Sequence, residues 1–401
     1  MRYEDRGTLG FGGGGRGKRF KQGGDLRGPV AGSKRGTCRL VPCRVLFLLF
    51  IALTLCLLSC QRERSEISLR KFPFPYQAAL AICSDVDYTS AQEFKEIHRT
   101  FEEIGLPLAG SFWMYNPKPY YTPKGYSRER LVEGMAYFEG LSSALSPEAD
   151  KIREFYRRGW LDSLHSYGNF STPRHRFSRE MAVSSINQLR EHGIKIIVWI
   201  NHGNEYNTQN LNRGIGYHRG AQKDSKEYHA DLTTRYGIKF VWNMGMTNIV
   251  GQDRHISSWE AMDFDVRHPF SSLMRFVKLF VGDETIWTLN KDNRVIEPFE
   301  LDDGTSVYVF KRFNNHPENI WKGAGAKDLA RQLAPNIIRK LEECGGYMVV
   351  YTHLGLNYPF DDASLAALRY VAAEYQQGRV WVTTTSQLLA YNLAYRYLKW
   401  N

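Results

Sequence analysis

Residues 77–87 read Gln-Ala-Ala-Leu-Ala-Ile-Cys-Ser-Asp-Val-Asp, an almost continuous apolar run that ends in two aspartates. Such a run, without alternation, is typical of a strand buried on both faces, as in parallel sheets. A helix is expected next, because Ser90 can cap it, apolar residues follow at helical spacing, and Gly105 can end it. This strand–helix unit predicts an α/β fold.

The same alternation of apolar strands and amphipathic helices continues along the chain. Further strands are expected at 108–115, 160–165, 195–201, 237–243, 347–352 and 380–384, and helices at 146–159, 178–192, 327–344, 364–377 and 386–399. Strands separated by helices predict a parallel sheet, either open or closed into a barrel. Residues 255–320 break the rhythm, and 305–313 alternate like an antiparallel strand, so we interpret 255–320 as an insertion.

The first 60 residues have the features of an export signal. Residues 1–44 form a Gly-rich basic tail without apolar periodicity, which predicts disorder. The uncharged run at 45–58 would make a helix of about 21 Å, short of the roughly 30 Å bilayer core, so a signal-peptide h-region is favoured over a spanning helix. The basic tail is unusually long for such a signal, and we expect the true start downstream of Met1.

The sequence Leu57-Leu-Ser-Cys60 after this run resembles the bacterial lipobox, in which the cysteine is lipidated. We therefore expect residues 45–60 to be the h-region and lipobox, 61–75 a linker, and 76–401 a catalytic domain. The protein would be an exported lipoprotein, anchored to a membrane through Cys60 and facing the periplasm or cell exterior. A signal anchor, or a plain signal peptide that ends in cysteine, is the alternative.

Composition excludes several classes of protein. The chain of 401 residues is 43% hydrophobic and 24% charged, as in globular proteins, and six cysteines are too few for a disulfide scaffold. The net charge of +11 belongs mostly to residues 1–44, which hold 11 Lys and Arg against 3 Asp and Glu. The body is thus nearly balanced, and a nucleic-acid partner is not expected.

Polar residues gather where the expected strands end. Asp85 and Asp87 follow the first strand, and His165, His202 and His353 follow three others. Because the carboxyl ends of parallel strands meet at one edge, these side chains should share a site. Each one alone has a structural explanation, such as a helix cap or a buried histidine. Together they suit a divalent metal with nitrogen and oxygen ligands, and proton transfer beside it.

Four stretches of the sequence resemble polysaccharide deacetylases (carbohydrate esterase family 4). They are the first-strand run 80–87 (Leu-Ala-Ile-Cys-Ser-Asp-Val-Asp), 164–169 (Leu-His-Ser-Tyr-Gly-Asn), 350–354 (Val-Tyr-Thr-His-Leu) and 380–389 (Val-Trp-Val-Thr-Thr-Thr-Ser-Gln-Leu-Leu). The resemblance implies a distorted (β/α)7 barrel, a metal that is usually Zn²⁺, and removal of N-acetyl groups from a cell-envelope or capsular polysaccharide.

The resemblance also assigns roles to individual residues. Asp85 would be the catalytic base, Asp87 and His165 metal ligands, and His353 the general acid. The family's second motif, His-Ser/Thr-x-x-His, ends in a second histidine ligand, but this chain has Asn169 there. By the strand-end reasoning His202 is the replacement, so the predicted ligand set is Asp87, His165 and His202.

Sugar recognition is expected from Asn204, in an amide-rich loop beside His202, and from the aromatic faces of Trp113 and Tyr115. Two other functions stay open at this point. The incomplete family motif at Asn169 would suit a carbohydrate-binding lipoprotein without catalysis. Asp85 with another carboxylate would suit a glycosidase on the same barrel.

Overall fold

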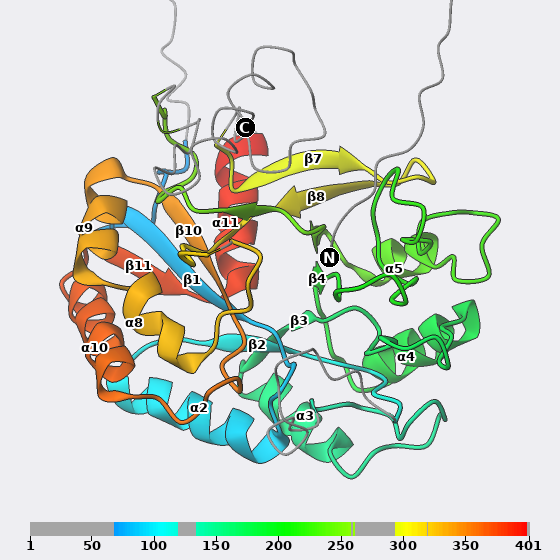
Figure 1. Ribbon diagram of the computed structural model, residues 1–401. Coiled ribbons are helices and arrows are strands. Elements are labelled where there is room, and N and C mark those ends of the chain that lie inside the picture. Colours follow the sequence, from blue (N-terminus) through cyan, green and yellow to red (C-terminus); the bar gives the residue numbers. More distant parts are fainter. Residues whose placement is uncertain (1–67, 119–133, 258–259, 261–292, 319, 399–401) are drawn as a thin grey trace, which may run out of the picture. The chain divides into compact units, whose positions relative to one another are not determined.

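A computed structural model describes residues 68–118, 134–257, 260, 293–318 and 320–398 (Figure 1). The described residues all belong to one compact unit, Glu66–Asn401. The predicted basic tail, the h-region and Cys60 lie outside the described residues. None of the helices within the described ranges combines the length and the apolar character needed to cross a bilayer.

The described chain forms a mixed α/β fold around one sheet. The strands are β1 (Ala78–Ser84), β2 (Ala109–Phe112), β3 (Leu161–Leu164), β4 (Val198–Ile200), β5 (Phe240–Trp242), β6 (Met246–Thr247), β7 (Ile296–Glu300), β8 (Ser306–Phe310), β9 (Arg312–Phe313), β10 (Tyr347–Thr352) and β11 (Val380–Thr383). The helices are α2 (Ala91–Ile104), α3 (Ala149–Arg157), α4 (Arg179–Glu191), α5 (Ala230–Tyr236), α8 (Leu329–Gln332), α9 (Pro335–Cys344), α10 (Asp362–Gln376) and α11 (Thr385–Tyr397).

The sheet curls on itself. Its strand order is β6-β9-β10-β1-β2-β3-β4-β5-β8-β7, with β11 beside β1. Among these strands of the described residues, only β7 and β8 pair antiparallel. The run 306–313 carries both β8, which pairs with β5, and β9, which pairs with β10. The ladder that leaves β1 through β2 therefore returns to it through β10, as in a barrel-type fold.

This pairing corrects the predicted insertion at 255–320. Strand β8 pairs antiparallel with β7, but its other edge is parallel to β5. Its burial does not alternate, since Val307 and Phe310 on opposite faces are both buried, and the period-2 sequence pattern cannot reveal the direction of the partner strand. The end of the expected insertion is thus part of the main sheet, whereas residues 261–292 lie outside the described residues.

The first strand is apolar throughout because both of its faces are covered. Ala79, Ala81 and Cys83 pack in one cluster with side chains of β4, β5 and α11, whereas Leu80 and Ile82 pack in a second cluster with α2, α9 and α10. The small side chains of Ala79 and Ala81 leave room for α11, shown in red in Figure 1, on the inner side of the curl. Helices therefore support β1 from both sides at the strand that carries the two aspartates.

Capping and spacing signals in the sequence predicted α2 correctly but α9 only in part. Ser90 forms a capping box with Glu93, and Gly105 closes α2 in the left-handed conformation, as predicted. The single helix expected at 327–344 is wrong. It is a 3-10 turn and α8, then a break before Pro335 starts α9, because proline lacks an N–H and disfavours a helical residue before it.

The linker expected at 61–75 is also shorter than predicted. Lys71 Nζ donates hydrogen bonds to Asp253 O (2.7 Å) and Gly345 O (2.5 Å), and the Phe72 ring lies 4.8 Å from that of Tyr347. These contacts attach residues 71 and 72 to the body of the domain.

Candidate functional site

The five residues singled out at strand ends lie together. Asp85 and Asp87 follow β1, His165 follows β3, His202 comes two residues after β4, and His353 follows β10. All but His202 are buried, and the His202 side chain is only 12% exposed. Backbone hydrogen bonds between neighbouring strands hold the strand ends, for example from Asp85 N to Thr352 O and from His165 N to Phe112 O. The parallel sheet thus brings these side chains to one edge, as predicted.

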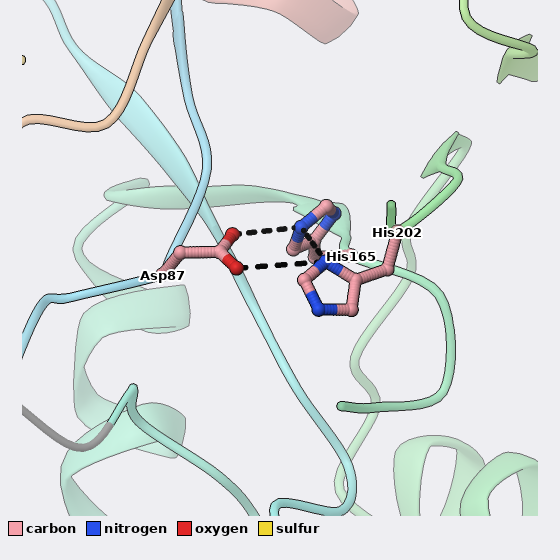
Figure 2. A group of neighbouring side chains, drawn as sticks. All are labelled: Asp87, His165 and His202. Carbon is pink, nitrogen blue, oxygen red and sulfur yellow. Dashed lines mark hydrogen bonds and ion pairs between the residues drawn. The ribbon is translucent and has the colours of Figure 1, made fainter. Parts of the chain in front are cut away.

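Three of these side chains form a compact triangle of ligand atoms (Figure 2). Asp87 Oδ2 lies 2.8 Å from His165 Nε2, Asp87 Oδ1 lies 3.5 Å from His202 Nδ1, and the two histidine nitrogens are 3.0 Å apart. Ligands about 2.0–2.1 Å from a tetrahedral zinc ion are separated by roughly 3.3 Å. The observed spacings scatter around that value, so Asp87, His165 and His202 fit a divalent cation.

An unpartnered atom in the same triangle supports this fit. Asp87 Oδ2 is buried without a hydrogen bond of acceptable geometry, although His165 Nε2 is close. Leaving a buried polar atom unpaired costs about 1–3 kcal/mol. A cation facing Oδ2 and the two ring nitrogens would satisfy the carboxylate.

The charges around the triangle keep Asp87 ionised. Burial alone would raise the pKa of its carboxyl, but His202 and His165 outweigh this effect and hold the pKa far below its usual value. Burial lowers the pKa of His202 to about 4, helped by the charge of His165, so its imidazole is neutral at pH 7. An ionised carboxylate and a neutral imidazole are the forms that bind metals, so Asp87 and His202 are in binding form. Burial would lower the pKa of His165, but Asp87 and Asp85 outweigh this effect and raise it, so a metal would have to displace a proton from this ring.

Asn169, which stands where the family's second histidine was expected, contacts His202. Its Oδ1 lies 3.2 Å from His202 Nε2, and the orientation of the amide is set by the Ser171 N–H, which donates to the same oxygen (3.3 Å). An acceptor at Nε2 places the ring proton there and leaves the Nδ1 lone pair facing Asp87 and His165. Asn169 therefore orients a ligand in this chain.

We expect Asn169→Leu to weaken zinc binding by about tenfold, the lower end for loss of a residue that orients a ligand. The lower end is expected because Ser171 Oγ, 3.1 Å from the same Nε2, can still accept a hydrogen bond. Competition with a chromophoric chelator would measure the affinity, with the exposed Asn187→Ala on α4 as control. Equal zinc affinity in Asn169→Leu and wild type would contradict the role.

Asp85 is paired with a buried arginine that was not predicted from the sequence. Arg312 Nη1 donates to Asp85 Oδ1 at 2.6 Å, and the two side chains are 0% and 3% exposed. The guanidinium carbon lies 3.5 Å from the Trp242 ring centre and 4.5 Å from that of Tyr351. The one sequence feature that points to Arg312 is its charge at the end of a segment in which apolar residues alternate.

This pairing sets the protonation state of Asp85. Burial raises the pKa of the carboxyl, but the charges of Arg312, His165 and His353 outweigh it and hold the pKa below its ordinary value. Arg312 binds Oδ1, and Asp85 Oδ2 faces His353 Nε2 at 3.7 Å. Asp85 is thus an ionised carboxylate whose second oxygen lies within the cluster.

His353 lies between the two aspartates. Its Nε2 is 3.7 Å from Asp87 Oδ2 as well as from Asp85 Oδ2, and its Nδ1 has no hydrogen-bond partner. Burial lowers the pKa of His353 despite both carboxylates. Once protonated, such an imidazole gives up its proton readily.

Two of the predicted sugar-binding residues are corrected. Trp113 packs against His165 and His202, and Tyr115 packs against Phe138 and donates to Met181 O, so both side chains are only 2% exposed and present no face to a sugar. The two aromatic rings contribute to the packing of the protein interior instead. Asn204 is half-buried and its amide donates to Ser171 O and accepts from Tyr206 N, so its contact with a sugar stays a prediction.

Comparisons with known proteins give only distant similarity. No family model matches the chain, and no curated protein matches it. Among solved structures, a candidate polysaccharide deacetylase from Mycobacterium smegmatis is similar with 13% identity and a TM-score of 0.39, over 84% of this chain and 98% of that one. A 4-alpha-glucanotransferase from Thermococcus litoralis has 12% identity and a TM-score of 0.34, over 78% of this chain and 38% of the transferase.

Proposed function

We propose that the protein is a metal-dependent hydrolase that removes N-acetyl groups from a cell-envelope or capsular polysaccharide. The observation that carries the proposal is the triangle of Asp87, His165 and His202 beside the Asp85–Arg312 ion pair and His353. The proposal includes Zn²⁺ as the metal and a distorted (β/α)7 barrel as the fold.

The residues divide the chemistry between them. Asp87, His165 and His202 would hold the metal, which when bound polarises a carbonyl and lowers the pKa of water. Asp85, kept ionised beside Arg312, accepts a proton from the attacking water. His353 donates a proton to the amine as the C–N bond breaks, so that acetate and a free amino sugar leave.

A glycosidase on the same residues is disfavoured by their charge states. Glycoside hydrolysis needs a carboxylic acid that stays protonated, with a raised pKa, beside a second carboxylate. The pKa values of Asp85 and Asp87 are both lowered. Asp162 has a raised pKa through burial, but its oxygens accept from Ser163 Oγ and Ser386 N at the start of α11.

We also propose that the protein is exported and anchored through a lipid on Cys60. The support is the apolar run at 45–58 followed by the lipobox-like sequence. Labelled fatty acid should enter the wild-type chain and not Cys60→Ser. Equal labelling of both would contradict the anchor.

Acetate release from N-acetylated glycans tests the proposal directly. The full-length chain, purified in detergent, should release acetate from chito-oligosaccharides or peptidoglycan fragments. It should lose this activity to a chelator and regain it with Zn²⁺. New reducing ends without acetate would indicate a glycosidase instead. Glycan binding that a chelator does not change, without acetate, would indicate a binding protein.

A further inference from the structure

Asp87 belongs to two groups of possible metal ligands. The second group consists of Asp85, Asp87 and His353, whose ligand atoms all lie within 4.8 Å of one another. We propose that these three residues form a second, weaker site for a divalent cation, which shares Asp87 with the first site and inhibits the enzyme when filled. The shared ligand and the inhibition rest on the function proposed above.

The spacings in this group suit a cation. His353 Nε2 lies 3.7 Å from both Asp85 Oδ2 and Asp87 Oδ2. Ligands at about 2.1 Å from an ion are separated by roughly 3.0–3.3 Å when adjacent and by about 4.2 Å when opposite. A value of 3.7 Å falls between these limits, so modest side-chain rotation would complete the contacts.

One unpartnered buried atom of this group faces the proposed site. Asp87 Oδ2 faces His353 as well as His165, and it has no hydrogen bond of acceptable geometry. His353 is buried and its Nδ1 is also without a partner, so placing the proton on Nδ1 and the lone pair on Nε2 breaks no hydrogen bond. Asp87 Oδ2 lies 2.8 Å from His165 Nε2 and 3.7 Å from His353 Nε2, so this one oxygen would be the ligand that the two sites share.

Charge makes the second site the weaker one. Arg312 already neutralises Asp85 through Oδ1, and a cation in the first site would neutralise Asp87. A second divalent ion would therefore enter a region that is no longer negative. Imidazole and carboxylate ligands would still select Zn²⁺ or a similar transition metal over Ca²⁺.

Filling this site would remove the proton-transfer groups. The cation would occupy the lone pair of His353 Nε2 and the free oxygen of Asp85. Neither group could then accept or donate a proton, so acetate release should fall as zinc rises above the level that fills the first site.

Zinc titration of the full-length chain, stripped of metal and followed by calorimetry at neutral pH, tests the second site. Wild type should bind two ions, the second at least about tenfold more weakly because of its charge. His353→Gln and His353→Phe should each bind one ion with the tight affinity unchanged, and His202→Gln should lose the tight ion. The exposed His192→Gln serves as the control and should behave as wild type.

Several outcomes separate this inference from the proposed function. Two ions bound in both His353 variants would overturn the second site. A single ion in wild type, lost in His202→Gln, would also overturn it and would leave the proposed function intact. No zinc binding at all would overturn both. Inhibition of wild type that is half-complete where the weaker site is half-filled would support the inference.

Discussion

Asp85→Asn should lower kcat for acetate release by about 10²–10⁴-fold, the usual range for loss of a general base. Asparagine has the same shape and keeps an oxygen for Arg312 Nη1, but it cannot accept a proton from water. Zinc affinity at the first site should hold, because Asp85 is outside the triangle of Asp87, His165 and His202. Steady-state kinetics and a zinc titration on the same preparation would measure both.

Asp162→Asn is the matched control for this change. Asp162 is another buried aspartate after the start of a strand, but its raised pKa and its contacts to Ser163 and Ser386 give it a structural role. This variant should keep wild-type kcat. Full activity in Asp85→Asn, with the protein folded, would exclude Asp85 as the base.

Arg312→Met should lower the free energy of unfolding by about 3–5 kcal/mol, because it leaves the carboxylate of Asp85 buried without its partner. It should also move the acidic limb of the pH–rate profile to higher pH. Arg312 holds the pKa of Asp85 down, so without it the carboxyl becomes protonated, and inactive as a base, at a higher pH. Urea unfolding of the metal-free protein and kcat/KM against pH would measure the two effects.

Arg331→Met gives the comparison on a partly exposed ion pair. Arg331 contacts Asp328 at 3.0 Å with side chains 28% and 25% exposed, so its loss should cost only about 0–1 kcal/mol. In the double variant Asp85→Asn/Arg312→Met the loss should be smaller than in Arg312→Met alone, since no buried charge is left unpaired. Equal unfolding free energies for Arg312→Met and Arg331→Met would contradict this account.

The sequence predicted the strand-end cluster because its signal is local. Asp85, His165 and His353 directly follow a strand and His202 comes two residues after one, and parallel strands bring their carboxyl ends to one edge. The first helix could also be predicted from the sequence, because Ser90 is its N-cap and Gly105 its C-cap.

Other features depend on contacts between distant segments and have no local signal. Arg312 is 227 residues from Asp85 in the sequence. The segment 305–313 that contains it has the sequence pattern of an antiparallel strand, and only the structure shows that β8 and β9 in this segment pair parallel with β5 and β10. Trp113 and Tyr115 follow a strand as sugar-stacking residues can, but tertiary packing buries both rings. The contact of Asn169 with His202 required the turns after β3 and β4 to meet.

X-ray absorption at the zinc edge would show whether Asp87, His165 and His202 hold a metal. With one equivalent of zinc on the full-length chain, we expect nitrogen and oxygen ligands at about 2.0–2.1 Å, including two imidazoles. His202→Asn should lose one imidazole contribution, whereas His192→Asn should keep both. A wild-type spectrum without imidazole scattering, or one unchanged by His202→Asn, would contradict a metal held by Asp87, His165 and His202.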